Sequence, residues 1–497
     1  MKPFLPSIDD LNPTPLYIQL YRHIKASIIS GDLLPGERLP SLRSIAAESG
    51  ISVTTSGLAY NQLLTEGYIE SRPQSGYYVM DIPDLVATLT SSSSQDSSEP
   101  TSPAAIHATL DLDLGSRAFD QGKYIYDLSA FDFQKWKKCN SRVYNQYAHL
   151  LLTESDTQGE LALRFEICKY LFSSRGVSAT PDQVVIGAGV QQLTIHLSRI
   201  LSLMGIDLVC TEDPGYLPIQ NIFRDRGFSL NKIPVTENGI DLDKLPINIP
   251  TAVYVSPANQ FPTGSVMPVA ARHRLLNWAR ANKSIIIEDD YDSELRYFGK
   301  PIPALKGLDE EESVVYLGSF SSTLFPSIKI SYMVLPQPMA NIFSEIKTAY
   351  TQTCSKTEQL TLALFMEDGY YYTGIKKLRN LYAQKLTLAV EAFNKYAGSL
   401  ITPINTQSGI NMTLMVASPL TAEELCARGE SLKLHLSPLA SIASAQTAAL
   451  GSSASADSAA ACTAAPQSKR HLIFYYNQIP IGEIDSLIHQ LVDSWNS

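Results

Sequence analysis

The feature that most constrains the fold of this chain is a long alternation of short apolar runs and helical segments, which begins near residue 108. The apolar runs share a length and composition typical of buried strands, and they lie at 183–186, 208–210, 251–255, 284–287, 314–317 and 330–335. Segments with helical periodicity separate them, as at 161–174 and 190–203. Such alternation is typical of a mostly parallel β-sheet covered by helices on both faces. We therefore predict an α/β fold for residues 108–497.

A second, smaller unit precedes this region. Residues 15–31 have apolar side chains at helical spacing and end at a glycine, Gly31. Ser41 is placed to cap a short helix that ends at Gly50, and Ser52 is placed to cap the next helix. Two helices joined by a tight turn form a helix-turn-helix, and the two β-like pieces at 68–80 form a wing. We predict a winged helix-turn-helix over residues 1–80.

The motifs of this unit, LPSLRSIA, ISVTTSGLAYNQL, EGYIESR and SGYYV, resemble those of the GntR winged helix. The resemblance implies that this domain binds a DNA operator. The side chains expected to contact DNA are Arg43, Ser52, Thr54, Thr55 and, in the wing, Arg72. The alternative for each single position is an ordinary polar residue at the surface.

The unit departs from the GntR pattern in its recognition helix. Val53 stands where the pattern usually has an arginine, and Ser56 stands where an apolar core residue is usual. From residue 15 to residue 80, five basic residues balance five acidic ones. Because phosphate neutralisation supplies most non-specific affinity for DNA, we expect an isolated domain to bind weakly. Two half-sites read by a dimer would recover affinity.

Two segments are low in complexity. Residues 81–107 are rich in Ser, Thr, Ala and Pro, and we predict a flexible linker there. Residues 437–468 are rich in Ala and Ser, and we predict a disordered insertion within a smaller C-terminal subdomain. No run approaches the roughly 18 apolar residues that cross a bilayer. We therefore expect a cytoplasmic protein that makes no contact with a membrane.

The landmarks of the larger region occur in a familiar order: TQGELALR, VVIGAGVQQL, EDPGY, SPANQFPTGSVMP, IIEDDYDSEL and PSIKISYMVLP. They resemble the fold-type-I aminotransferase-like domain of MocR-type regulators, which form one subfamily of the GntR regulators. That resemblance implies a homodimer and a pocket for pyridoxal phosphate (PLP). In this pocket Asp289 would pair with the pyridine nitrogen and Tyr291 would contact the ring oxygen. The other implied pocket residues are Gly189, Val190, Gln191, Ser319 and Lys329 at the phosphate, with Tyr216 and Asn259 lining the pocket.

The residue that decides the chemistry is Ser322. In the family the turn after this strand reads S/T-F-S-K, and its lysine forms a Schiff base with the cofactor. Here residues 319–322 read Ser-Phe-Ser-Ser, so a hydroxyl stands where the family has an amine. Without that amine we expect no covalent PLP and no aminotransferase activity. The arginines that hold an effector carboxylate in the best-known relatives are also missing from residues 214–218 and 474–478.

Three hypotheses follow from these residues. We favour a DNA-binding regulator whose aminotransferase-like domain dimerises and senses a small-molecule effector, with PLP bound non-covalently if it is bound. A second hypothesis is a PLP-dependent aminotransferase that uses another lysine. A third is a decayed or structural relative. The acidic residues at 288–292 also allow a cation site as an alternative to a pyridine partner, although we expect no metal.

Overall fold

The computed structural model describes residues 14–72, 75–81, 125, 127–298, 303–439 and 470–496. The chain divides into two compact units, Met1–Gln121 and Gly122–Ser497. The predicted linker lies outside the described residues from residue 82 onward, and so does most of the predicted insertion, from residue 440. Cys462 is also outside them, while the five described cysteines are unpaired.

The first unit is the predicted winged helix-turn-helix. Its elements are α1 (Leu16–Ile29), α2 (Leu42–Ser49), α3 (Val53–Thr65), β1 (Ile69–Arg72) and β2 (Gly76–Val79). The predicted caps form: the Ser41 hydroxyl accepts a hydrogen bond from the Ser44 amide at 3.2 Å, and Gly50 ends α2 with φ of 67°. The two strands pair antiparallel as a wing. A core of apolar side chains from all three helices and both strands holds the unit together.

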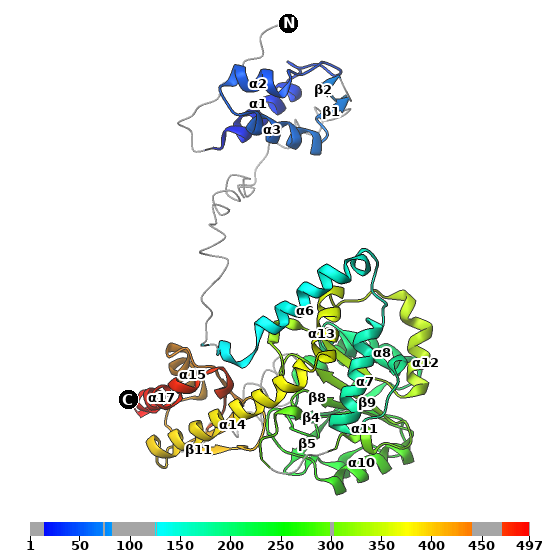
Figure 1. The fold of residues 1–497 in the computed structure, drawn as a ribbon, viewed down its shortest axis with the longest axis vertical. Helices are drawn as coiled ribbons and strands as arrows, with labels where there is room; N and C mark the ends of the chain where they lie inside the picture. The colour runs from blue at the N-terminus through cyan, green and yellow to red at the C-terminus, as the bar shows by residue number, and fades with distance from the viewer. Residues whose placement is uncertain are drawn as a thin grey trace, which may run out of the picture. The chain divides into compact units, whose positions relative to one another are not determined.

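The second unit is built on an eight-stranded sheet with the order β3-β10-β9-β8-β7-β4-β5-β6 (Figure 1). The strands are β3 (Val184–Gly187), β4 (Leu208–Asp213), β5 (Ser229–Thr236), β6 (Gly239–Ile240), β7 (Ala252–Val255), β8 (Ile285–Asp290), β9 (Val314–Ser319) and β10 (Ser331–Val334). The neighbours from β9 to β5 pair in parallel, whereas β10 runs antiparallel to both its neighbours and β6 runs antiparallel to β5. The predicted mostly parallel sheet is confirmed.

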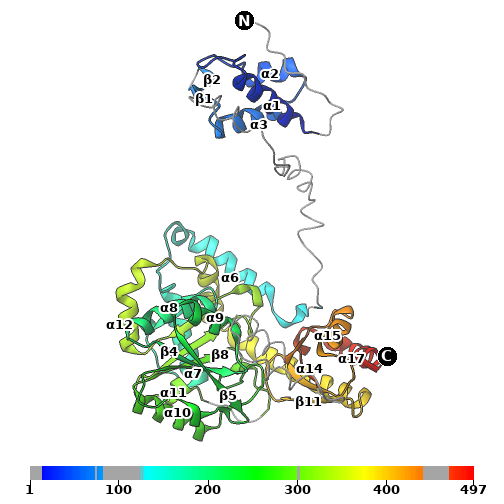
Figure 2. The ribbon, with the colours of Figure 1, turned by 180° about the vertical axis from the view of Figure 1, so that it is seen from behind.

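Helices cover both faces of this sheet, as Figure 1 and the reverse view of Figure 2 show. On β9, Val315 and Leu317 pack with α8 (Val190–Leu203), α9 (Leu217–Asp225) and α12 (Gln337–Ile346). Tyr316 points to the other face, where it packs with α6 (Phe133–Gln146), α7 (Leu161–Arg175) and α13 (Lys356–Glu367). Val314 is on the same face as Tyr316 and packs with α10 (Val269–Asn282) and α11 (Leu305–Leu308). Burial on both faces explains why the strands read as continuous apolar runs.

A smaller C-terminal subdomain follows the long helix α14 (Tyr370–Tyr396). Its four-stranded antiparallel sheet has the order β11-β12-β14-β13. The remaining elements are β11 (Ile401–Ile404), β12 (Met412–Val416), α15 (Ala422–Ser431), β13 (Leu436–Pro438), β14 (Arg470–Phe474) and α17 (Ile484–Asn496). Ser437 and Pro438, which we had assigned to the insertion, instead pair with Ile473 and Leu472 as part of β13. Their backbone completes the edge of the sheet, so the low-complexity composition begins inside a strand.

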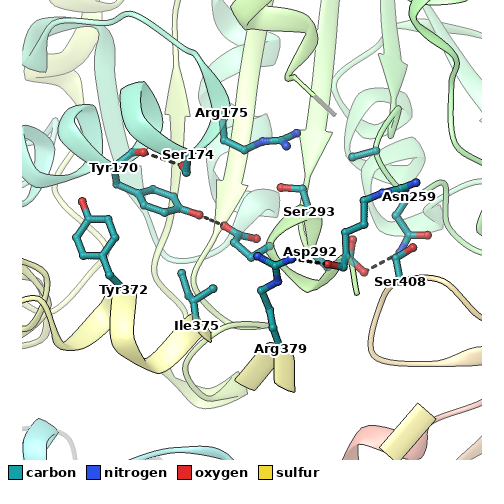
Figure 3. A pocket seen from close by; sticks show the side chains of 13 residues that line it. Tyr170, Ser174, Arg175, Asn259, Asp292, Ser293, Tyr372, Ile375, Arg379 and Ser408 are labelled. Carbon is teal, nitrogen blue, oxygen red and sulfur yellow. Dashed lines mark hydrogen bonds between the residues drawn. The ribbon is translucent and has the colours of Figure 1, made fainter. Parts of the chain in front are cut away.

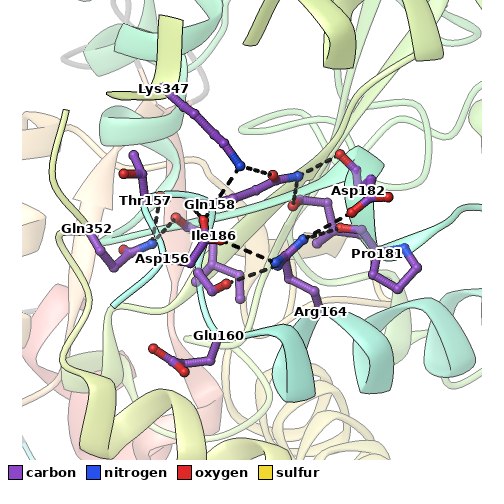
Figure 4. Close-up of polar contacts among 12 residues, drawn as sticks. Asp156, Thr157, Gln158, Glu160, Arg164, Pro181, Asp182, Ile186, Lys347 and Gln352 are labelled. Carbon is purple, nitrogen blue, oxygen red and sulfur yellow. Dashed lines mark hydrogen bonds and ion pairs between the residues drawn. The ribbon is translucent and has the colours of Figure 1, made fainter. Parts of the chain in front are cut away.

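A buried polar network fixes the chain just before α7 against β3 (Figure 4). The Gln158 amide nitrogen donates to the carbonyls of Asp182 and Val184, at 2.6 and 3.0 Å. The Arg164 guanidinium donates to the carbonyls of Gly159 and Pro181, at 2.9 and 2.8 Å. Because these buried groups are satisfied by backbone acceptors, the network holds β3, and with it the turn that follows β3, in one position.

Candidate functional site

A pocket of about 530 Å³ lies at the carboxyl ends of the strands. Open α/β sheets bind ligands at this edge because loops from several strands converge there. The residues that line it come from segments far apart in the sequence: Ala188, Gly189, Val190, Gln191, Tyr216, Ser256, Phe261, Asp289, Tyr291, Ser319, Ser321, Ser322, Lys329, Ser331, Ile410, Asn411 and Tyr475. The strand ends of β3, β8 and β9 therefore meet at one site.

One end of the pocket is suited to an anion. The turn after β3 passes through Gly189, whose φ of 94° is a conformation that favours glycine, and α8 begins at the next residue. The N–H groups of the first turn of α8 and the helix dipole favour negative charge there. Ser319 adds a hydroxyl that accepts a hydrogen bond from the Ser331 hydroxyl at 3.0 Å. Lys329 is the one cationic side chain among the described residues that line this pocket.

A buried carboxyl group also lines the pocket. Asp289, at the end of β8, accepts a hydrogen bond from the Tyr254 hydroxyl on β7 through Oδ2 at 2.6 Å. Its other oxygen, Oδ1, is shielded from solvent and has no hydrogen-bond partner among the described residues. Burial raises the pKa of Asp289 to about 7, although the bond from Tyr254 opposes the shift. The free oxygen is therefore an acceptor that a ligand N–H would satisfy.

A second buried carboxyl group supports the wall behind the pocket. Glu212, on β4, accepts hydrogen bonds from the Ser256 amide at 3.3 Å and from the Gln260 side chain at 3.2 Å. Burial raises the pKa of Glu212 to about 8, and the neighbouring Asp289 adds to the shift. These contacts shape the segment that carries Ser256 and Phe261 into the pocket.

Nearly all the predicted cofactor residues line this pocket. Tyr216, Asp289, Tyr291, Ser319 and Lys329 do so, together with the turn at 189–191. Ser322 lines it as well, so a hydroxyl rather than an amine faces the site.

Asn259 does not line this pocket, although we had predicted that it would. Its side-chain amide donates to Asp292 Oδ2 at 2.7 Å and lines a neighbouring cavity instead. Phe261 takes its place, because the chain turns between the two residues and brings the phenyl ring to the pocket wall.

The acidic residues at 288–292 do not converge on a cation. Both oxygens of Glu288 accept backbone N–H groups, from Leu305 at 2.7 Å and Lys306 at 2.8 Å. Asp290 forms an ion pair with Arg175 at 2.7 Å. No cluster of His, Cys, Asp or Glu suited to a metal ion occurs in the part of the chain that the structure describes. The arrangement of these residues therefore does not support the alternative of a cation site here.

The predicted DNA-contacting residues differ in exposure and in the contacts that their side chains already make. Arg43 is exposed on α2, and Thr54 is exposed on α3. The Ser52 hydroxyl lies 2.8 Å from the Thr55 hydroxyl and accepts the Thr55 amide at 3.0 Å, so both side chains take part in capping α3. Arg72 forms an ion pair with Glu70 at 2.6 Å.

Two departures from the GntR pattern have structural consequences. Val53 is 48% exposed at the start of α3, so an apolar side chain faces solvent where a cation is usual. Ser56 is buried, and its hydroxyl bonds to the Ser52 carbonyl at 3.3 Å, which removes the polar cost of placing it in the core.

Comparison with known proteins agrees with this two-part architecture. Residues 16–79 match the family described as bacterial regulatory proteins, gntR family, and residues 118–434 match aminotransferase class I and II. The chain is 37% identical over 442 residues to the uncharacterized HTH-type transcriptional regulator YdeL of Bacillus subtilis, covering 88% of this chain and 91% of YdeL. It is 32% identical to the probable rhizopine catabolism regulatory protein MocR of Rhizobium meliloti, covering 86% of each. The chain belongs to the MocR-like HTH-type transcriptional regulators.

The solved structures support the fold of the second unit of this MocR-like chain. Kynurenine aminotransferase of Pyrococcus horikoshii matches with a TM-score of 0.61 at 20% identity, over 79% of this chain and 94% of the aminotransferase. LysN, the α-aminoadipate aminotransferase of Thermus thermophilus, matches with the same TM-score and identity. At this identity the likeness concerns the fold alone. None of the described helices of this MocR-like protein is both long enough and apolar enough to cross a membrane.

Sequence reasoning missed Tyr254 and Glu212, which shape the pocket of this MocR-like domain. Each lies in or beside an apolar run that we had interpreted only as a buried strand. The usable signal was position: both residues are close to the carboxyl end of a strand in a parallel sheet, where polar side chains meet a ligand.

Proposed function

We propose that this chain is a DNA-binding transcription regulator of MocR type whose aminotransferase-like domain forms a homodimer and binds PLP without a covalent bond. The observation that carries the proposal is Ser322. It lines a pocket whose other residues suit the cofactor, and it has no amine to offer. The domain would therefore use the pocket for sensing and not for transamination.

The fit to PLP rests on two features of the pocket. Asp289 Oδ1 is a shielded acceptor with no partner in the described chain, and a protonated pyridine nitrogen would satisfy it. The N-terminus of α8, Ser319 and Lys329 would hold the phosphate. Tyr254 would keep the Asp289 carboxylate in position, and the Tyr291 phenol would lie toward the ring oxygen. When bound, PLP supplies an electron-withdrawing ring, and these residues orient and enclose it.

The pocket argues against aminotransferase activity. A lysine is needed both to attach the cofactor and to move the proton at the substrate carbon. Serine forms no stable imine. Lys329 is exposed, with φ of 50°. Because its ammonium group would contact the phosphate, it would not be available to form an imine.

Dialysis against PLP followed by an absorbance spectrum tests this part of the proposal. We expect the wild-type protein to bind PLP reversibly: it should take up PLP on dialysis against the cofactor and lose it on later dialysis against buffer. Borohydride should fix no cofactor to it. Ser322→Lys should retain PLP and become fixable, which peptide mass mapping would locate at residue 322. Borohydride fixation to the wild-type protein would show that another lysine serves. Absence of binding in both proteins would refute the cofactor pocket.

The homodimer is supported by an apolar face on α7. Leu161, Phe165 and Phe172 repeat at helical spacing and are 60%, 53% and 70% exposed. Leu152, just before the helix, is 88% exposed. Exposed apolar side chains gathered on one helix face are typical of an interface, and a second copy of this chain is the occupant that we propose. A dimer would also bring two near-neutral winged helices to two half-sites, which compensates for weak single contacts.

A further inference from the structure

A second cavity lies between α7, the chain that follows β8, and the first turns of α14 (Figure 3). Its volume is about 300 Å³, at the lower end of the range for small-molecule sites. Figure 3 shows Tyr170, Tyr372 and Ile375 on one side of it and Asp292, Asn259 and Ser408 on the other. None of the three hypotheses drawn from the sequence assigned a role to this cavity.

The two pockets diverge from the end of β8. Successive side chains of a strand point to opposite faces. Asp289 therefore serves the first pocket, while Asp290 points to the side of α7, where Arg175 donates to it at 2.8 Å and Tyr316 at 2.6 Å. The bond between Asn259 and Asp292 lies on the second side, because both residues line the second cavity. The same short segment thus contributes side chains to both pockets.

The second cavity is lined by charges that do not pair with one another. Two carboxyl groups line it, Asp292 and Glu294, and each accepts one hydrogen bond from a neutral side chain, Asn259 and Tyr170 respectively. Of its three guanidinium groups, Arg175 pairs with Asp290, whereas no ion pair joins Arg296 or Arg379 to Asp292 or Glu294 within the described chain. Nε and Nη1 of Arg296 are shielded from solvent and have no hydrogen-bond partner there, and neither has Oε2 of Glu294. Among the described residues, Arg379 donates to the carbonyl of Arg296, at 2.9 Å, and no other bond of its side chain is seen there.

The shielded atoms without partners, Nε and Nη1 of Arg296 and Oε2 of Glu294, are costly, and a ligand with complementary groups would remove that cost. Both signs are present in one small cavity, so the complementary ligand carries a carboxylate and an ammonium group. The aromatic and aliphatic wall of Tyr372 and Ile375 suits an apolar substituent. Arginine is well matched to a carboxylate because it presents parallel N–H donors.

We propose that this cavity binds an apolar α-amino acid. Its carboxylate contacts Arg296 and Arg379, its ammonium group contacts Glu294 and Asp292, and its side chain packs on Tyr372 and Ile375. The proposal goes beyond the cofactor pocket, because no residue that holds the amino acid lines that pocket. Since Tyr372, Ile375 and Arg379 lie on α14, which leads into the C-terminal subdomain, the ligand would bear directly on the junction between the two parts of this unit.

Isothermal titration of the full chain with L-leucine tests the proposal, and two analogues test each charge. 4-Methylpentanoate lacks the amino group, and leucinamide lacks the carboxylate. We expect each analogue to bind about 10- to 100-fold more weakly than leucine, as the loss of a charged hydrogen bond implies. Arg296→Gln and Glu294→Gln should weaken leucine binding by a similar factor.

Three further variants make the result specific. Arg280→Gln is a control. It removes an exposed arginine of α10 that pairs with Glu311 and does not line the second cavity, so this variant should bind leucine as the wild type does. Asp289→Ala changes a residue that lines the first pocket and not the second cavity, so it should also leave leucine binding unchanged. Tyr372→Ala alters an exposed wall residue, so it should weaken binding without threatening the fold.

The outcomes separate cleanly. Failure of leucine and of the other apolar amino acids to bind at millimolar concentration would refute the proposal. Binding that survives in Arg296→Gln and in Tyr372→Ala would refute it as well. Loss of leucine binding in Asp289→Ala would place the amino acid in the cofactor pocket and overturn the second site. Loss of PLP binding alone in that variant would leave the second site supported.

Discussion

The bond between Tyr254 and Asp289 provides the sharpest test of the cofactor pocket. Tyr254→Phe removes a 2.6 Å hydrogen bond to a buried carboxyl group whose other oxygen already lacks a partner in the described chain. A hydrogen bond to a charged group contributes about 1.5 to 3 kcal/mol, so PLP should bind about 10- to 100-fold more weakly. The pKa of Asp289, about 7 in the intact pocket, should rise further, because this bond is what opposes the effect of burial.

The assay is equilibrium dialysis with PLP over a series of pH values. Ionised Asp289 is the form that pairs with the ring nitrogen, so the affinity of the wild-type protein should increase as the pH rises through about 7. In Tyr254→Phe that increase should move to higher pH. If the variant binds PLP with unchanged affinity and pH dependence, Asp289 does not hold the ring and the reasoning is refuted.

Tyr316→Phe is a matched control for this experiment. Tyr316 donates a bond of the same length, 2.6 Å, to Asp290, and it is equally buried, but it lies on the opposite face of the sheet. It should cost stability and leave PLP affinity unchanged. Equal losses of affinity in the two variants would mean that both act through general destabilisation of the strand ends.

The remaining predictions concern stability, assembly and DNA binding. Burial raises the pKa of Glu212 from 4.5 to about 8, so the folded protein binds more protons than the unfolded chain between these pH values. The free energy of unfolding should therefore fall as the pH rises from about 4.5 to 8. Denaturant titration should show a smaller fall for Glu212→Gln. Phe172→Glu should convert the proposed dimer to monomer in analytical ultracentrifugation. Leu203→Glu, at an exposed position of α8 on the other face of the sheet, should not. Arg43→Ala should weaken binding to operators selected from random DNA, and the monomeric Phe172→Glu protein should bind them still less well, as a gel-shift titration at fixed salt would measure.

Much of the fold could be predicted because its determinants are local. Ser41 and Ser52 precede helices that each need a cap, and the continuous apolar runs need a sheet covered on both sides. The start of the insertion, predicted at Ser437, could not be placed correctly from sequence. The composition of the segment is low in complexity from Ser437 onward, but Ser437 and Pro438 form a strand because they pair with β14, which lies some thirty residues later.

The cofactor pocket was less predictable than the sheet. Asp289 and Ser319 were found because they end strands in a recognised order of motifs. Phe261 was missed in favour of Asn259, since the direction of each side chain depends on how the chain turns between them. The second cavity could not be found at all from sequence, because Glu294 and Arg379 are far apart in the chain and only the packing of α14 brings them to one cavity.

The chain at residues 125 and 127, where the described part of the second unit begins, makes polar contacts with the C-terminal part of this unit. Lys385, a fully buried residue of α14, forms an ion pair with Asp127 at 2.7 Å and donates to the Asn477 carbonyl at the same distance. The Ile125 amide donates to the Lys433 carbonyl at 3.1 Å. Ile125 and Asp127, the first described residues of the second unit, are therefore fastened to the C-terminal subdomain and to α14 respectively. Because α14 also lines the second cavity, a ligand that shifts this helix would also shift Asp127, which pairs with Lys385 of α14.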